Sequence, residues 1–143
     1  MYKCKYFQIR ELVSPIVYNK WRVQAWMFFD EGVLKELDLI RERFGTPIVI
    51  NNWANNGSLR QCGLRSNLDQ IPKTKTLQNQ LYLSAHCAGK AFDLHASNNR
   101  RLYDLILSMI KQKELKYFRR LENFTSTYTW VHVDTYDSGQ IEF

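Results

Sequence analysis

The stretch that decides the fold is Ser84–Ala96, which reads SAHCAGKAFDLHA. Six residues separate His86 from Asp93, among them one glycine and two alanines. If KAFDLHA forms a strand entered through a turn at the glycine, Asp93 and His95 lie on one face, and the intervening Phe and Leu lie on the other. The pattern therefore predicts a strand with one apolar face and one face that carries an acid and an imidazole.

A second stretch, TWVHVD, alternates in the same way and ends at Asp134. His132 and Asp134 share one face of this predicted strand, and the two valines share the other. With His86 from the preceding turn, the two strands supply two histidines and one carboxylate, enough to hold Zn²⁺ with a fourth position left for water. All three histidines of the chain lie in these two stretches. On spacing alone, an ordinary role as hydrogen-bonded polar residues stays open for them.

The remaining elements indicate mixed α and β structure. A helix is expected from a cap at Asp30 through Phe44, followed by a stop at Gly45. A second helix is expected over Asn99–Lys113, where apolar residues recur at helical spacing. Between them, TPIVINNW has the β-branched composition of a short buried strand. It leads into a long polar loop from Asn56 to about Leu81, of the kind that often carries function in compact domains.

Composition limits the possible classes of protein. The 143 residues are 45% hydrophobic and contain no linker, so we expect a single domain over residues 1–143. No run approaches the roughly 18 apolar residues of a membrane span, and the first residues lack the apolar segment of a secretory signal. Three cysteines at unrelated spacings favour free thiols. The net charge of +6 favours acidic partners, which include nucleic acid, anionic wall polymers and substrates with carboxylates.

Three motifs carry a resemblance to a known family. SAHCAGKAFD resembles the Ser-x-His-x-x-Gly-x-Ala-x-Asp signature of the zinc D-Ala-D-Ala carboxypeptidase family, which shares the hedgehog/DD-peptidase fold and includes bacterial DD-carboxypeptidases and phage lysins. WVHVD is similar to the strand with the third zinc ligand in the branch that ends in His-x-Asp. CGLRS is similar to the segment Ser-Gly-Tyr-Arg-Ser, with Cys62 and Leu64 as substitutions. The motifs occur in the family's order, and similar lead-in segments extend the resemblance over nearly the whole chain.

The resemblance implies a fold and a set of site residues. The fold would be α+β and hedgehog/DD-peptidase-like, with a central, mainly antiparallel sheet flanked by helices. Zn²⁺ would be held by His86, Asp93 and His132. Arg65 would bind a carboxylate or carbonyl of a peptidoglycan stem peptide through its planar fork. Ser84 would form a hydrogen bond near the ligand loop, although simple turn chemistry is an equal alternative.

One departure from the family pattern concerns the general base. Many relatives place a Glu three residues before the last zinc histidine, and this chain has Thr129 there. Asp134 is the candidate to orient the attacking water or a ligating histidine. His95 is the reserve base or a partner of a ligand, and a purely structural role is open for both residues. Cys87, beside His86, is expected to be a buried small side chain and not a ligand.

Three functional classes compete. The first is a zinc metallopeptidase that hydrolyses peptide bonds in bacterial cell wall. The second is a wall-binding module that has lost catalysis. The third is a basic nucleic-acid-binding domain, in which the basic and aromatic segment KYFRRLENF would contact bases or phosphates. A solvated helix end with core aromatics is the simpler interpretation of this segment. We expect the first, in a monomer that binds neither nucleic acid nor membrane. Without a secretory signal, it would be made in the host cytoplasm and reach the wall during phage lysis or in a virion.

Overall fold

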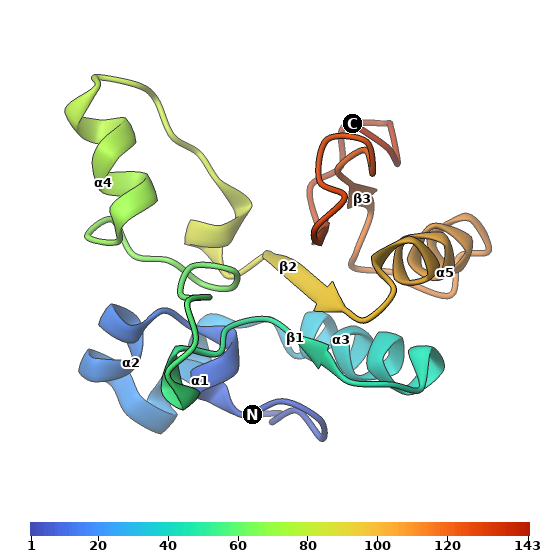
Figure 1. Ribbon diagram of the computed structural model, residues 1–143, viewed down its shortest axis with the longest axis horizontal. Helices are drawn as coiled ribbons and strands as arrows, with labels where there is room; N and C mark the ends of the chain where they lie inside the picture. The colour runs from blue at the N-terminus through green and yellow to red at the C-terminus, as the bar shows by residue number, and fades with distance from the viewer.

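The computed structural model describes all 143 residues and has an antiparallel sheet at its centre (Figure 1). The sheet has the strand order β1-β2-β4-β3, with β1 at Ile48–Val49, β2 at Ala91–Ala96, β4 at Val131–Asp134 and β3 at Arg120–Leu121. Every neighbouring pair of strands is antiparallel. The coarse α+β class and the mainly antiparallel sheet expected from the sequence are therefore confirmed.

Eight helices, five α and three 3₁₀, complete the fold. In chain order they are α1 (Ile9–Leu12), α2 (Pro15–Trp21), the 3₁₀ helix η1 (Arg22–Phe28), α3 (Glu31–Phe44), η2 (Trp53–Asn55), α4 (Gln70–Leu77), η3 (Ala85–Ala88) and α5 (Asn99–Lys111). No helix has the length and apolar content of a membrane span.

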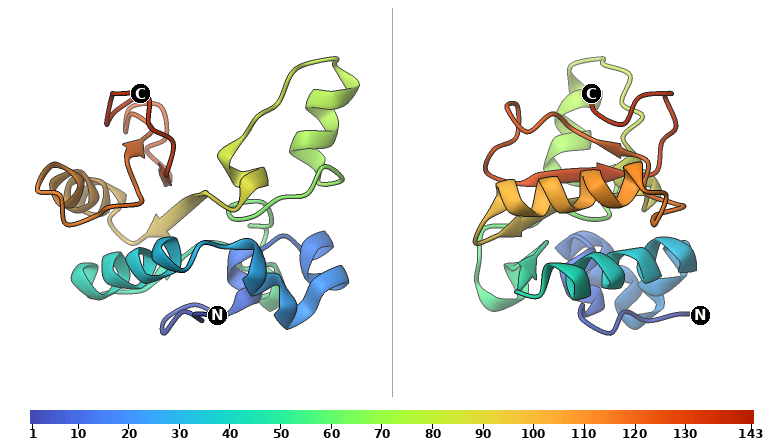
Figure 2. Two further views of the ribbon diagram at one scale, coloured as in Figure 1. Left: turned by 180° about the vertical axis from the view of Figure 1, so that it is seen from behind. Right: turned by 90° about the vertical axis from the view of Figure 1, so that its right-hand side faces the viewer.

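The two helices predicted from apolar periodicity are confirmed as α3 and α5. The carboxylate of Asp30 accepts a hydrogen bond from the backbone N–H of Gly32 and caps the start of α3. At the other end, Gly45 adopts a left-handed conformation with φ of 82°, which costs glycine little and ends the helix. Figure 2 shows α3 and α5 side by side on one side of the molecule.

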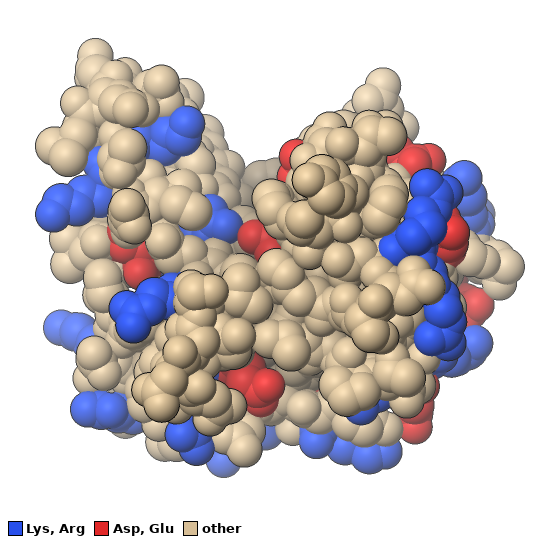
Figure 3. All heavy atoms as spheres, viewed as in Figure 1, with Lys and Arg blue, Asp and Glu red and all other residues tan.

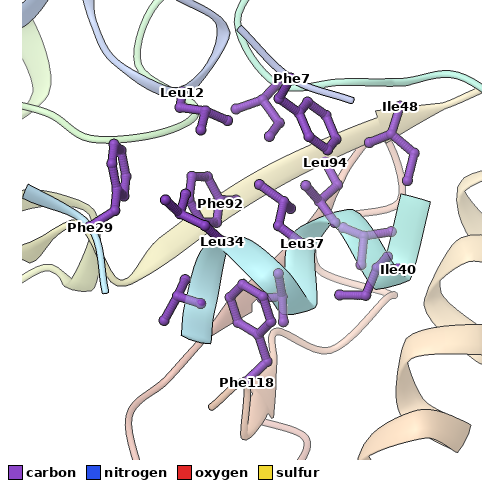
Figure 4. Packing of buried hydrophobic residues seen from close by; sticks show 14 of the residues in the cluster. Phe7, Leu12, Phe29, Leu34, Leu37, Ile40, Ile48, Phe92, Leu94 and Phe118 are labelled. Carbon is purple, nitrogen blue, oxygen red and sulfur yellow. The ribbon is translucent and has the colours of Figure 1, made fainter. Parts of the chain in front are cut away.

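The apolar face of the sheet packs on these helices. Phe92 and Leu94 of β2 and both valines of β4 have no solvent exposure. They belong to one continuous cluster of 27 buried hydrophobic residues that includes the inner face of α3 (Figure 4). Burying one face of β2 and β4 in this way leaves their other face, with its polar side chains, toward the functional site.

A buried acid ties β3 to α3. Glu36, on α3, is 8% exposed, and its carboxylate accepts hydrogen bonds from three successive backbone N–H groups, at residues 116–118. Phe118 follows into the core with no exposure. The chain therefore enters β3 from a fixed point, which matters because β3 forms one wall of the site.

Three sequence expectations were wrong. The loop expected from Asn56 to Leu81 contains helix α4. The segment KYFRRLENF contains strand β3 and no helix end, although its core aromatic was expected. Cys87 is exposed, because it lies on the outer side of η3. All three cysteines are free, as predicted.

Candidate metal centre

The antiparallel pairing of β2 and β4 brings two of the predicted ligands face to face. Asp93 lies directly opposite His132 in the register, and Oδ1 of Asp93 is 2.8 Å from Nδ1 of His132. The alternation inferred from the sequence, with polar residues on one face and apolar residues on the other, is what places both side chains outside the core.

The third predicted ligand, His86, comes from the short helix η3 just before β2. Ser84 caps this helix, since its hydroxyl accepts a hydrogen bond from the backbone N–H of His86 at 3.2 Å. Gly89 ends it with φ of 68°, and a Cβ at this position would lie 2.6 Å from the carbonyl oxygen of Phe28. Only glycine fits this turn, which returns the chain to the sheet with the imidazole of His86 pointing at Asp93.

The three side chains converge on one point. Nε2 of His86 lies 3.3 Å from Oδ1 of Asp93, the same oxygen that contacts His132. One ligand atom from each residue lies within 4.8 Å of the others. His86 is 3% exposed, and the side chains of the other two are 12–13% exposed. This group could hold a metal ion.

The tautomer of His86 suits metal binding. Its Nδ1 lies 2.9 Å from the carbonyl oxygen of Gly63, which can only accept, so Nδ1–H donates and Nε2 presents its lone pair to the site. A Cβ on Gly63 would lie 2.1 Å from the backbone oxygen of Leu12, so only glycine lets this segment pass between Leu12 and His86. Burial lowers the pKa of His86 and favours the neutral imidazole that a metal needs.

The CGLRS motif supports the centre mainly through its backbone. Besides the Gly63 carbonyl, the Cys62 carbonyl accepts from the N–H of Asp93 at 2.8 Å, and the N–H of Arg65 donates to the carbonyl of His86 at 3.3 Å. The motif thus holds two of the three ligands in place. Sequence reasoning had connected it only with substrate.

His132 lies between two carboxylates. Its Nδ1 faces Asp93, and its Nε2 lies 3.1 Å from Oδ2 of Asp134. Burial acts to lower the pKa of His132, but the hydrogen bonds to Asp134 and Asp93 outweigh it and raise the pKa to about 9. Burial acts to raise the pKa of Asp93, but the hydrogen bonds from His132 and His86 outweigh it and hold this pKa well below the usual range. A cation is therefore favoured at this point, either a proton or a metal ion.

Asp134 is placed to orient His132. Asp134 is 1% exposed. Its carboxylate accepts hydrogen bonds from Nε and Nη2 of Arg120, from the backbone N–H of Tyr136 and from Nε2–H of His132. Burial alone would raise the pKa of Asp134, but these donors lower it. Two roles were considered for Asp134, namely orienting the attacking water and orienting a ligating histidine. This geometry supports the second role.

Arg65 is buried beside the group. Nη2 lies 3.3 Å from Oδ2 of Asp93, Nη1 donates to the hydroxyl of Tyr82 at 2.8 Å, and Nε donates to the carbonyl of Gln61. The guanidinium thus lies near the predicted metal, and its N–H groups already donate hydrogen bonds to other residues of the protein. Its role in substrate binding remains a prediction.

No hydrogen bond links the side chains of His95 and Thr129 to the three predicted ligands. Nε2 of His95 is 3.6 Å from Sγ of Cys62, and its ring lies near Trp130. Burial lowers the pKa of His95. Thr129 is exposed in the turn before β4. No hydrogen bond joins His95 to the three ligands, so its proposed role as a base has no direct geometric support.

A cavity of about 350 Å³ opens beside His132, lined by Tyr82, Leu83, Ser84, Ala85, Arg120, Glu122, His132, Asp134, Tyr136 and Phe143. We call it the site cavity. Figure 3 shows the molecule notched on this side, between the lobe that carries α4 and the lobe formed by the C-terminal segment. Ser84 lines the cavity as well as capping η3, so both of its expected roles remain open.

Sequence reasoning missed several of these lining residues. Arg120 and Glu122 alternate along the segment RRLENF, which is a strand-like signal that its basic and aromatic composition obscured. Phe143 comes from far along the chain, yet its ring lies edge-on to that of His132 at 5.9 Å. Arg120 stacks over the same Phe143 ring at 4.1 Å. The site is therefore completed by pairings between distant segments.

Comparisons with known proteins gave no match to any family model, curated protein or solved structure. The site is accordingly described by its own geometry: two imidazoles and one carboxylate that could hold a metal ion, with His132 on the wall of an open cavity.

Proposed function

We propose that the protein is a zinc-dependent peptidase of the hedgehog/DD-peptidase fold that hydrolyses peptide bonds in peptidoglycan stem peptides or cross-links. The observation that carries the proposal is the convergence of His86, Asp93 and His132 on one point beside a cavity. These are the positions that the resemblance to the zinc D-Ala-D-Ala carboxypeptidases assigns to the metal. A catalytic zinc site has three such protein ligands and one open position.

The donor atoms suit zinc in type and in spacing. Imidazole nitrogen and carboxylate oxygen are usual zinc ligands, at about 2.0–2.2 Å from the ion, so tetrahedral ligands lie about 3.3 Å apart. The corresponding atoms of His86 and Asp93 are 3.3 Å apart, and those of Asp93 and His132 are 2.8 Å apart, as in a hydrogen bond. All three donor atoms lie within 4.8 Å of one another, so movement of the side chains would admit the ion.

The chain's own residues prepare the site in two ways. Gly63 and Asp134 accept the second N–H of each imidazole and so orient both rings. The site cavity, with Arg120 and aromatic side chains on its walls, offers room for a peptide beside the ligands. When bound, zinc would lower the pKa of water and polarise the peptide carbonyl.

A second function keeps the same fold and metal without catalysis. Thr129 replaces the usual base, and Asp134 is fully engaged with other groups, which favours a wall-binding module. Against it stand the retained ligand set and the open cavity.

The test is hydrolysis of purified sacculi by the zinc-loaded protein. We expect new amino and carboxyl groups on released peptides, loss of activity with a chelator, and recovery with zinc. Binding to sacculi with full zinc occupancy and no hydrolysis of any wall type would support the binding module instead.

A further inference from the structure

Asp134, the acid first considered as general base, is poorly placed to exchange a proton with substrate. Both oxygens of the Asp134 carboxylate are occupied, by Arg120, Tyr136 and His132, and the residue is 1% exposed. The position used by many relatives is Thr129, which has no acid. General base catalysis would therefore use another proton acceptor at the cavity.

The pairing of β3 with β4 brings Glu122 to the site. Arg120 lies opposite Asp134 and Leu121 opposite Val133, so the next residue, Glu122, lies opposite His132. Its backbone N–H donates to the carbonyl of His132 at 3.2 Å. Leu121 is fully buried on the core face, so Glu122 follows Arg120 onto the face that carries the metal ligands.

The carboxylate of Glu122 is available. Glu122 lines the site cavity together with His132 and Asp134, and it is half-buried. Its side chain takes part in no hydrogen bond or ion pair within the protein, unlike those of Asp93 and Asp134. It is thus the acid on the cavity wall whose oxygens are free to contact water or substrate.

We infer that Glu122 is the general base of the reaction, an inference that rests on the proposed peptidase function. Its carboxylate takes a proton from the attacking water as the water oxygen forms a bond to the peptide carbonyl carbon. When the C–N bond breaks, its electron pair stays on nitrogen, and Glu122 returns the proton to that nitrogen. One water is consumed, and one carboxyl and one amine product are released. Asp134 remains a positioning residue for His132.

The experiment compares Glu122→Gln with the parent and with Glu42→Gln, a control at an exposed acid that forms only a 3.8 Å salt bridge with Lys5. Kinetics are measured on the muropeptide that the parent cleaves fastest, and zinc content and thermal unfolding are measured in parallel. We expect kcat of Glu122→Gln to fall by about 10²- to 10⁴-fold, with KM, zinc content and unfolding temperature close to those of the parent. Glu122→Asp should recover part of the rate, and Glu42→Gln should match the parent.

Different failures have different meanings. A kcat for Glu122→Gln equal to that of the parent would overturn the role of Glu122 and leave the peptidase intact. Loss of zinc or of folding together with activity, with no partial recovery in Glu122→Asp, would make Glu122 a structural residue and also overturn the inference. A zinc-loaded parent that hydrolyses no wall type would overturn the proposed function itself.

Discussion

The two walls of the site cavity are built differently. The wall formed by β4 and β3 has a completely buried inner face, and β4 is paired on both edges. The opposite wall comes from residues 82–85, which follow helix α4, and we call residues 70–83 the α4 arm. In this arm Pro72 is the buried member of the helix, and four aliphatic side chains are exposed, namely Ile71, Leu77, Leu81 and Leu83. The residues that could hold a metal lie on or beside the sheet, and the arm supplies only wall residues.

Removing a ligand should give the largest effect and test where the metal binds. His86→Ala and His132→Ala each delete one of three protein donors, so we expect zinc content to fall from about one per chain to near zero. Lys75→Ala in the α4 arm is the matched control and should keep the parent's zinc content. Elemental analysis of dialysed protein measures this. Full occupancy in both histidine variants would place the metal elsewhere.

Stability should show the same contrast between core and arm. Leu37 in α3 is fully buried, so Leu37→Ala should lower the free energy of unfolding by about 2–5 kcal/mol. Leu77 in the arm is 79% exposed, and Leu77→Ala should change it by less than about 0.5 kcal/mol. Denaturant unfolding of the two variants measures this, and equal losses would mean that the arm is packed as firmly as the core.

Asp134→Asn separates orientation of a ligand from its direct loss. The amide keeps the shape but loses the charge that pairs with Arg120 and His132, so we expect zinc affinity to fall by about 10- to 100-fold. The measurement is competition for zinc with a chelating indicator. Unchanged affinity would mean that Asp134 does not support His132.

The smallest expected effect is the release of a proton. In the metal-free protein the pKa of His132 is raised to about 9, so at pH 7 this imidazole carries a proton that zinc must displace. We expect about one proton to be released per zinc at pH 7, and fewer as the pH rises through 9. Calorimetry in buffers of different ionisation enthalpy measures this.

The raised pKa also means that the stability contributed by His132 in the metal-free protein is present below about pH 6.5 and is lost as the pH rises through about 9.

Strands and helices with periodic apolar residues could be predicted from the sequence, and so could the convergence of His86, Asp93 and His132. Local alternation placed Asp93 and His132 correctly because each strand buries one face. Helix α4 was missed because QIPKTKTL has no apolar stripe, and because its proline suggests a break. In the structure Pro72 lies in the first turn, where a backbone N–H has no helical partner to lose.

The support around the ligands could not be predicted, because it depends on contacts between distant segments. The Gly63 carbonyl reaches His86 only after residues 62–65 pack between the N-terminal helices and β2. Glu122 reaches the site only through the register of β3 with β4. The spacing of residues within a motif predicts neither the contact of Gly63 with His86 nor the position of Glu122.

X-ray absorption at the zinc edge of the zinc-loaded protein tests the central claim most directly, since Cys87 adjoins His86 in the sequence and the backbone of Cys62 contacts that of Asp93. We expect one zinc per chain surrounded by nitrogen and oxygen at about 2.0–2.2 Å, with histidine scattering and no sulfur. A shell at about 2.3 Å, which is typical of zinc bound to thiolate, would contradict the site formed by His86, Asp93 and His132.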